Sequence, residues 1–133
     1  MSSMRVNILR ASSVLWVIWG VVHLLLSSDA SGGFSAIADA VEVGSLQHAY
    51  APAVGGILNQ HGWNLGWFGV VTLIGAVFIW RRNLTAVWVT GLVGGLADLG
   101  YLFFVDLPGY VNFVPGTVMT FVSGAAILLS FYS

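Results

Sequence analysis

Four apolar stretches, separated by short polar segments, dominate the hydrophobic pattern of the chain. Each is about 18 to 22 residues long, the length that an α-helix needs to cross a hydrocarbon layer of about 30 Å. None carries lysine or arginine in its interior. The pattern predicts an all-α integral membrane protein, a four-helix bundle forming a single transmembrane domain over residues 1–133. The predicted spans are residues 8–26, 63–80, 84–105 and 111–131.

The arginines predict the orientation of this bundle. Arg5 and Arg10 stand at the start of the first stretch, and Arg81 and Arg82 link the second to the third. Two crossings separate the pairs, so all four arginines fall on one side, which the positive-inside rule assigns to the cytoplasm. The sequence therefore predicts an N-in, C-in, multi-pass protein of the bacterial inner (plasma) membrane. The acids expected on the outer side are Asp29, Asp39, Glu42 and Asp106.

The segment 28–62 is the largest part outside the four stretches. After a glycine break, apolar residues recur at helical spacing from Phe34 to Val41, with polar residues on the other face. This predicts a short amphipathic helix on the outer membrane surface, in a lid between the first two spans. Pro52 suits the first turn of a further helix, which either runs directly into the second span or breaks near Gly62.

A cleaved signal peptide is an alternative for the first stretch. Arg5 and Arg10 would form its basic region, and the run Ser28-Asp29-Ala30 resembles a cleavage site. The length of the apolar run and the presence of His23 within it favour retention. Cleavage would leave three spans and change no other orientation.

Composition narrows the classes of function. The chain is 58% hydrophobic and 7% charged, with a net charge of −1 and no lysine, so it offers no electrostatic footprint to nucleic acid. It has no cysteine, which excludes disulfides, thiolate nucleophiles and iron–sulfur ligation. Redox chemistry would therefore need a bound cofactor, whose identity the sequence does not specify.

Asp98 is the most informative single residue, because it lies inside the third span. A carboxylate facing lipid costs about 2.5 to 3.5 kcal/mol on insertion scales, so Asp98 is expected to point into the bundle. Gly91, Gly94 and Gly95 share its helical face, and small residues at that spacing mark close helix contact. Asp98 is either a structural acid satisfied by a neighbour or a functional acid, ligand or proton-relay group.

His23 is the expected partner of Asp98. It shares a face of the first span with Trp16, Trp19 and Gly20, and antiparallel threading places it in the same outer half of the membrane as Asp98. A hydrogen bond between the two would fix the imidazole tautomer and raise its basicity. The alternative is a histidine that satisfies a buried hydroxyl or carbonyl.

His61 and Asn64 open the second span as a polar pair three residues apart, on one helical face. They are candidate cofactor-binding residues, with an ordinary interfacial helix start as the alternative. His23, His48, His61 and Asp98 all map to the outer half, and such a set would suit zinc, copper or iron. The chain has no HxxxH or HxxE spacing, so the metal stays unspecified; His23 and His61 are also candidate haem ligands.

Six tryptophans give the chain a further candidate site. Trp19 and Trp67, with their aromatic neighbours, are candidates to line a pocket for a flat hydrophobic molecule such as a quinone. Lipid-facing and interfacial packing is the alternative. The sequence resembles small bacterial four-helix families such as the DoxX-type proteins, because its first helix carries a histidine and a basic link follows its second helix. Its tryptophans and buried acid are similar to those of sterol isomerase-type membrane proteins. No residue role is transferred from either family.

Three hypotheses follow. The first is a membrane protein that binds an apolar ligand, cofactor or ion at a polar site in the outer half, built around His23 and Asp98. The second is a membrane-embedded enzyme in which these two residues perform acid–base chemistry, such as isomerisation, on a lipid-soluble substrate. The third is a structural subunit that docks onto a membrane protein partner or a second copy.

Overall fold

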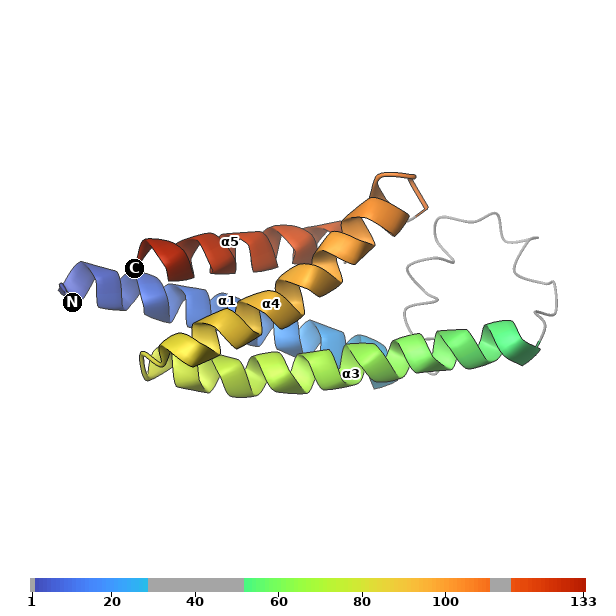
Figure 1. Cartoon of the computed structure of the whole chain (residues 1–133), viewed down its shortest axis with the longest axis horizontal. Coiled ribbons are helices and arrows are strands. Elements are labelled where there is room, and N and C mark those ends of the chain that lie inside the picture. Colours follow the sequence, from blue (N-terminus) through green and yellow to red (C-terminus); the bar gives the residue numbers. More distant parts are fainter. Residues whose placement is uncertain (1, 29–51, 111–115) are drawn as a thin grey trace.

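The computed structural model describes residues 2–28, 52–110 and 116–133, and every regular element in them is helical. In chain order the elements are α1 (Ser3–Ser28), α3 (Pro52–Trp80), α4 (Leu84–Tyr101), the π-helix η2 (Leu102–Asp106) and α5 (Val118–Tyr132). Figure 1 shows them as a bundle of antiparallel neighbours. The all-helical prediction is confirmed. The predicted amphipathic lid helix falls outside the described residues, as do His48 and three of the acids.

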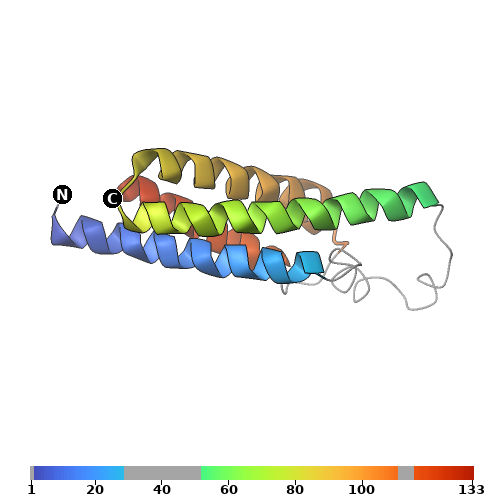
Figure 2. The ribbon, with the colours of Figure 1, turned by 90° about the horizontal axis from the view of Figure 1, so that it is seen from below.

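Three helical segments are long and apolar enough to cross a membrane. They are Ser3–Ser27, Asn59–Trp80 and Leu84–Asp106, and the apolar helix α5 is shorter, with 15 residues. α3 continues without interruption from Pro52 to Trp80, so the helix that Pro52 opens runs directly into the second apolar stretch. Its 29 residues correspond to about 43 Å, and Figure 2 shows it extending past the end of α1.

The helices α1, α3, α4 and α5 are arranged as in a four-helix bundle, with each helix packed against two neighbours. α1 packs against α3 and α5, and α4 packs against the same two, so that α1 and α4 are diagonal partners. Both termini and the α3–α4 turn lie at one end (Figures 1 and 2). We call this the basic end, because it holds Arg5, Arg10, Arg81 and Arg82; the acidic end is the opposite one, towards which Asp98 and Asp106 lie.

Two tryptophans of α1 fill the space along the diagonal. Trp16 and Trp19 are almost completely buried and meet edge to face with ring centroids 6.0 Å apart. Trp16 lies directly against Gly94 of α4, where a Cβ atom would collide with its ring. The glycine therefore lets α4 approach the indole, as the small-residue face of α4 predicts.

Small residues also set the contact between α1 and α3. A Cβ atom added to Gly69 would stand 2.7 Å from the carbonyl oxygen of Gly20, which leaves no room for a side chain between the backbones. Towards the basic end, Ser13 Oγ donates to the Ala76 carbonyl oxygen over 2.7 Å. On the other side of α1, Ser12 Oγ donates to the Ala126 carbonyl oxygen of α5 over 2.8 Å. Each hydroxyl thus joins α1 to a neighbour without leaving a polar group unpaired.

The α3–α4 turn is a Schellman motif with an arginine where glycine is usual. The Asn83 N–H donates to the Phe78 carbonyl oxygen and the Arg82 N–H donates to that of Ile79, the two bonds that define the motif. Arg82 has φ of 66°, in the left-handed region. Asn83 then caps α4, its Oδ1 accepting the Ala86 N–H over 3.0 Å.

Candidate functional site

Trp19 connects the two residues on which the predicted site depends. Its side chain is 0% exposed, and its indole Nε1–H donates to Asp98 Oδ2 over 2.7 Å. Asp98 is also buried, and Ser123 of α5 lies within hydrogen-bonding reach of the same carboxyl group. The carboxyl of Asp98 therefore points into the bundle and joins three helices.

The imidazole of His23 stacks on the indole ring of Trp19. Its ring lies parallel to that of Trp19, with centroids 3.5 Å apart and an interplanar angle of 18°. His23 Nδ1 is 2.9 Å from the Trp19 carbonyl oxygen. Because a carbonyl oxygen only accepts, Nδ1 carries the hydrogen, and the neutral ring keeps its lone pair on Nε2.

Asp98 and His23 are therefore neighbours of the same indole rather than of each other. The expected hydrogen bond between them is replaced by an indole N–H on the carboxyl side and a backbone carbonyl on the imidazole side. The physical reason is the size and chemistry of Trp19. A buried indole needs an acceptor for its N–H, and a carboxylate at the same depth meets that need.

The other candidate residues separate into two groups. His61 of α3 is exposed but lies close enough to His23 to interact with it electrostatically. Asn64 instead accepts the Trp67 Nε1–H over 3.0 Å, a bond within one turn of α3. Trp67 is 41% exposed and packs on Phe68. The structure thus brings His61 towards the predicted site and leaves Asn64 and Trp67 paired with each other.

The tryptophans do not gather around one pocket. Trp16 and Trp19 are in the core, whereas Trp67 and Trp88 are exposed on the outside of the bundle, where Trp88 packs on Phe131. Within residues 2–28, 52–110 and 116–133, no three or more histidine, cysteine or carboxylate side chains are placed to hold a metal ion. One of the metal ligands that the sequence suggests, His48, lies outside those ranges.

A second polar cluster, which the sequence does not predict as a site, lies beside Asp98. η2 carries Asp106, whose Oδ1 accepts the Thr117 hydroxyl over 2.5 Å. Tyr101 lies near both Asp98 and Asp106, and its hydroxyl occupies the space that a Cβ atom on Gly116 would need. Tyr101 Oη, Asp106 Oδ2 and Thr120 Oγ1 are buried, and none bonds to a described protein group. Of these atoms, those of Tyr101 and Asp106 keep hydrogen-bonding capacity near the buried carboxyl of Asp98.

Part of this cluster is visible in the sequence, because Asp106 opens the Asp-Leu-Pro-Gly turn signature after the third apolar stretch. The π-helical hydrogen bonds around it, such as that from the Leu107 N–H to the Leu102 carbonyl oxygen, are not visible in the sequence, because π-helix is rare and has no clear sequence signal. Comparisons with protein-family models, curated proteins and solved structures give no match. Function is therefore inferred from the residues above.

Proposed function

We propose that this chain is a four-span, N-in and C-in protein of the bacterial inner membrane, with a ligand-binding polar site in its outer half. The three long apolar helices support insertion, and the four arginines at one end support the orientation, because basic residues are retained on the cytoplasmic side. In this orientation the acidic end faces outward. An apolar ligand, cofactor or ion would bind beside Asp98, Trp19 and His23.

One observation carries the proposal: a buried carboxyl, indole and imidazole in contact across the diagonal of an apolar bundle. Ionisable groups in such surroundings are costly, and by default they indicate a ligand, ion or proton site. The nearby buried hydroxyl of Tyr101 adds polar capacity that the described protein groups do not use. A polar or charged group of a ligand would meet those atoms while an apolar body stays between the helices.

The experiment compares Asp98→Asn with the parent after purification in mild detergent. The absorbance spectrum and mass spectrometry of co-purifying molecules identify a haem, quinone, metal or other ligand. We expect Asp98→Asn to lower occupancy at least about ten-fold, the effect of one charged hydrogen bond, and to leave the amount inserted in the membrane unchanged. Ser13→Ala, a buried hydroxyl near the basic end, is the matched control. Equal occupancy in parent and Asp98→Asn would refute the site.

An acid–base enzyme is the second candidate, favoured by the tautomer of His23. With Nδ1–H held by the Trp19 carbonyl oxygen, Nε2 presents a lone pair that can take a proton from a lipid-soluble substrate. Turnover of an isoprenoid or steroid in a lipid extract should follow a bell-shaped pH–rate profile that His23→Ala abolishes. Ser27→Ala, on the same helix, should keep the profile. No turnover by the parent would exclude this candidate.

A further inference from the structure

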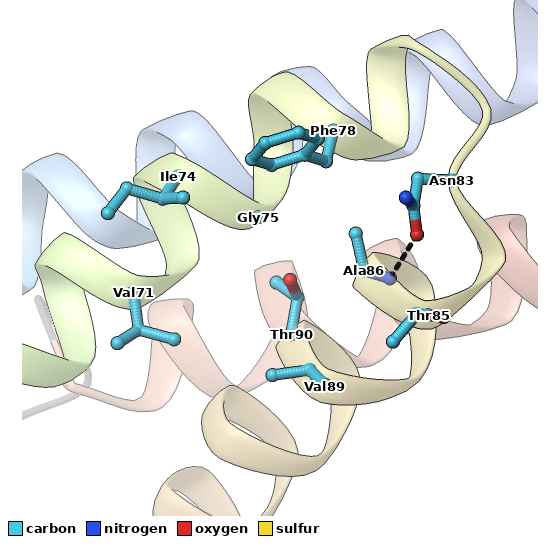
Figure 3. A pocket seen from close by; sticks show the side chains of 9 residues that line it. All are labelled: Val71, Ile74, Gly75, Phe78, Asn83, Thr85, Ala86, Val89 and Thr90. Atoms are coloured by element: carbon cyan, nitrogen blue, oxygen red, sulfur yellow. Dashed lines mark hydrogen bonds between the residues drawn. The ribbon is translucent and has the colours of Figure 1, made fainter.

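An apolar groove with a volume of about 310 Å³ lies between α3 and α4, next to the turn that joins them. Its walls come from half-exposed apolar side chains of both helices (Figure 3). It is separate from Asp98 and His23, neither of which lines it. The wall residues used below are Val71, Ile74 and Phe78 of α3 and Val89 of α4.

The floor of the groove is formed where Gly75 faces Thr90 (Figure 3). A Cβ atom at Gly75 would collide with the Thr90 hydroxyl, so the missing side chain lets α3 and α4 come into contact beneath the groove. Thr90 is completely buried, and its Oγ1 has no hydrogen-bond partner among the described groups. Because Thr90 is buried, its hydroxyl adds almost no polar surface, and the apolar lining suits a flexible hydrocarbon chain rather than a polar molecule.

The inner end of the groove, at Val71, lies about the depth of one leaflet from the end of α3. From Val71 to Trp80, α3 rises about 14 Å, and half of a hydrocarbon layer of about 30 Å is about 15 Å. The groove ends at Asn83, in the turn at the basic end. In the proposed orientation it runs from the cytoplasmic surface to the middle of the membrane.

Two positively charged residues lie in the turn at which the groove ends. Arg81 and Arg82 are exposed in the turn, immediately before Asn83. Asn83 Oδ1 is occupied by the Ala86 N–H, which leaves the side-chain NH₂ on its other side to donate (Figure 3). The carboxylates of the described chain, Asp98 and Asp106, lie towards the opposite end. An anionic group is therefore attracted to the turn.

Arg82 occupies a backbone conformation that glycine or asparagine adopts at lower cost. At φ of 66° an arginine is disfavoured at a helix C-terminus, and the motif does not need its side chain. Strained positions of this kind cluster where a side chain serves binding or switching. Arg82 directly precedes Asn83, which lines the groove, so ligand binding at this turn would give the strain such a use.

We propose that this groove binds an anionic phospholipid of the inner leaflet, with the phosphate at Arg81, Arg82 and Asn83 and one acyl chain along α3 and α4. The proposal rests on the membrane orientation proposed above and not on the polar site in the outer half. Basic residues at the cytoplasmic ends of membrane helices attract anionic head groups in this way. A second copy is a poorer occupant, because copies inserted in the same orientation place their acidic ends away from these arginines.

The test offers the purified full chain equal amounts of phosphatidylglycerol and phosphatidylcholine with identical acyl chains, in mild detergent. Native mass spectrometry then counts the lipid retained per protein. The parent should retain phosphatidylglycerol over phosphatidylcholine, and the double variant Arg81→Gln, Arg82→Gly should lose about five-fold in that preference per arginine removed. Arg5→Gln, which removes a charge at the same end without bordering the groove, should keep the preference.

A second variant tests the groove itself. Val89→Trp places a large side chain from an exposed wall position into the groove, and it should lower retention of both lipids while Arg81 and Arg82 remain. If circular dichroism shows that Val89→Trp has lost helix, Ile74→Trp replaces it. Asp98→Asn should keep the lipid preference, which separates this proposal from the polar site.

Three results would overturn the proposal. The first is equal retention of the two lipids by the parent. The second is an unchanged preference in the double arginine variant. The third is a dimer of the parent that Val89→Trp abolishes, which would identify a second copy as the occupant.

Discussion

At the scale of single residues, Trp19 determines how the ionisable groups of the bundle are satisfied. Its N–H supplies a donor to Asp98, its carbonyl oxygen supplies an acceptor to His23, and its ring covers the imidazole. Removing the indole N–H would leave a buried carboxyl one donor short, which costs about 1 to 3 kcal/mol. In the proposed site, Trp19 would therefore act as a positioning residue.

A double-mutant cycle tests this role. Trp19→Phe and Asp98→Ala should each lower thermal stability in detergent, and the double variant should lose less than the sum. We expect a coupling energy of about 0.5 to 3 kcal/mol, because both changes remove the same hydrogen bond. Trp19→Phe paired with Ser12→Ala is the control and should be additive, since Ser12 bonds to α5 near the basic end. Additivity of Trp19→Phe with Asp98→Ala would contradict the role given to the indole.

At the scale of helices, α1 and α3 approach most closely where two glycines face each other. A methyl group on Gly69 would meet the backbone of Gly20 at 2.7 Å and of Leu24 at 3.0 Å, and neither atom can move alone. A methyl group on Gly66 would meet only the side chain of Ser27, at 3.0 Å and beyond. The two positions lie on the same face of α3 but differ in what would have to shift.

Gly69→Ala should therefore force α1 and α3 apart, at a cost of about 1 to 3 kcal/mol typical of overpacking. Gly66→Ala is the matched variant and should cost less, because the Ser27 hydroxymethyl group can rotate. Thermal denaturation in one detergent compares them. Equal stability of both variants and the parent would mean that the α1–α3 contact is looser than described.

The sequence predicts the helices well because a run of apolar residues long enough to cross a membrane has few other stable conformations. It also predicts the close approach at Gly94 and the inward direction of Asp98. It does not predict that an indole separates His23 from Asp98, because spacing along one helix does not reveal which side chain of another fills the gap. A left-handed Arg82 and a π-helix at Asp106 also oppose local preference, so the sequence does not predict them.

At the scale of the whole molecule, the membrane orientation is testable because the chain has no cysteine. Single cysteines at Ser2 and Asn83 should react with a membrane-impermeant maleimide only after the inner face is opened, since both positions lie at the basic end. A cysteine at Leu107, an exposed position towards the acidic end, should react in intact spheroplasts. The reverse pattern would invert the orientation, and reaction of Ser2 and Leu107 from the same side would exclude four crossings.

The length of α3 has a consequence for what surrounds the protein. At about 43 Å, α3 exceeds a hydrocarbon layer of about 30 Å by more than the usual tilt of up to about 40° absorbs. In the proposed orientation, with Trp80 at the cytoplasmic boundary and little tilt, Pro52 would stand about 12 Å beyond the hydrocarbon layer, so the first turns of α3 would lie at or above the lipid head groups. A soluble protease or antibody added from outside would then meet the beginning of α3 before any other part of that helix.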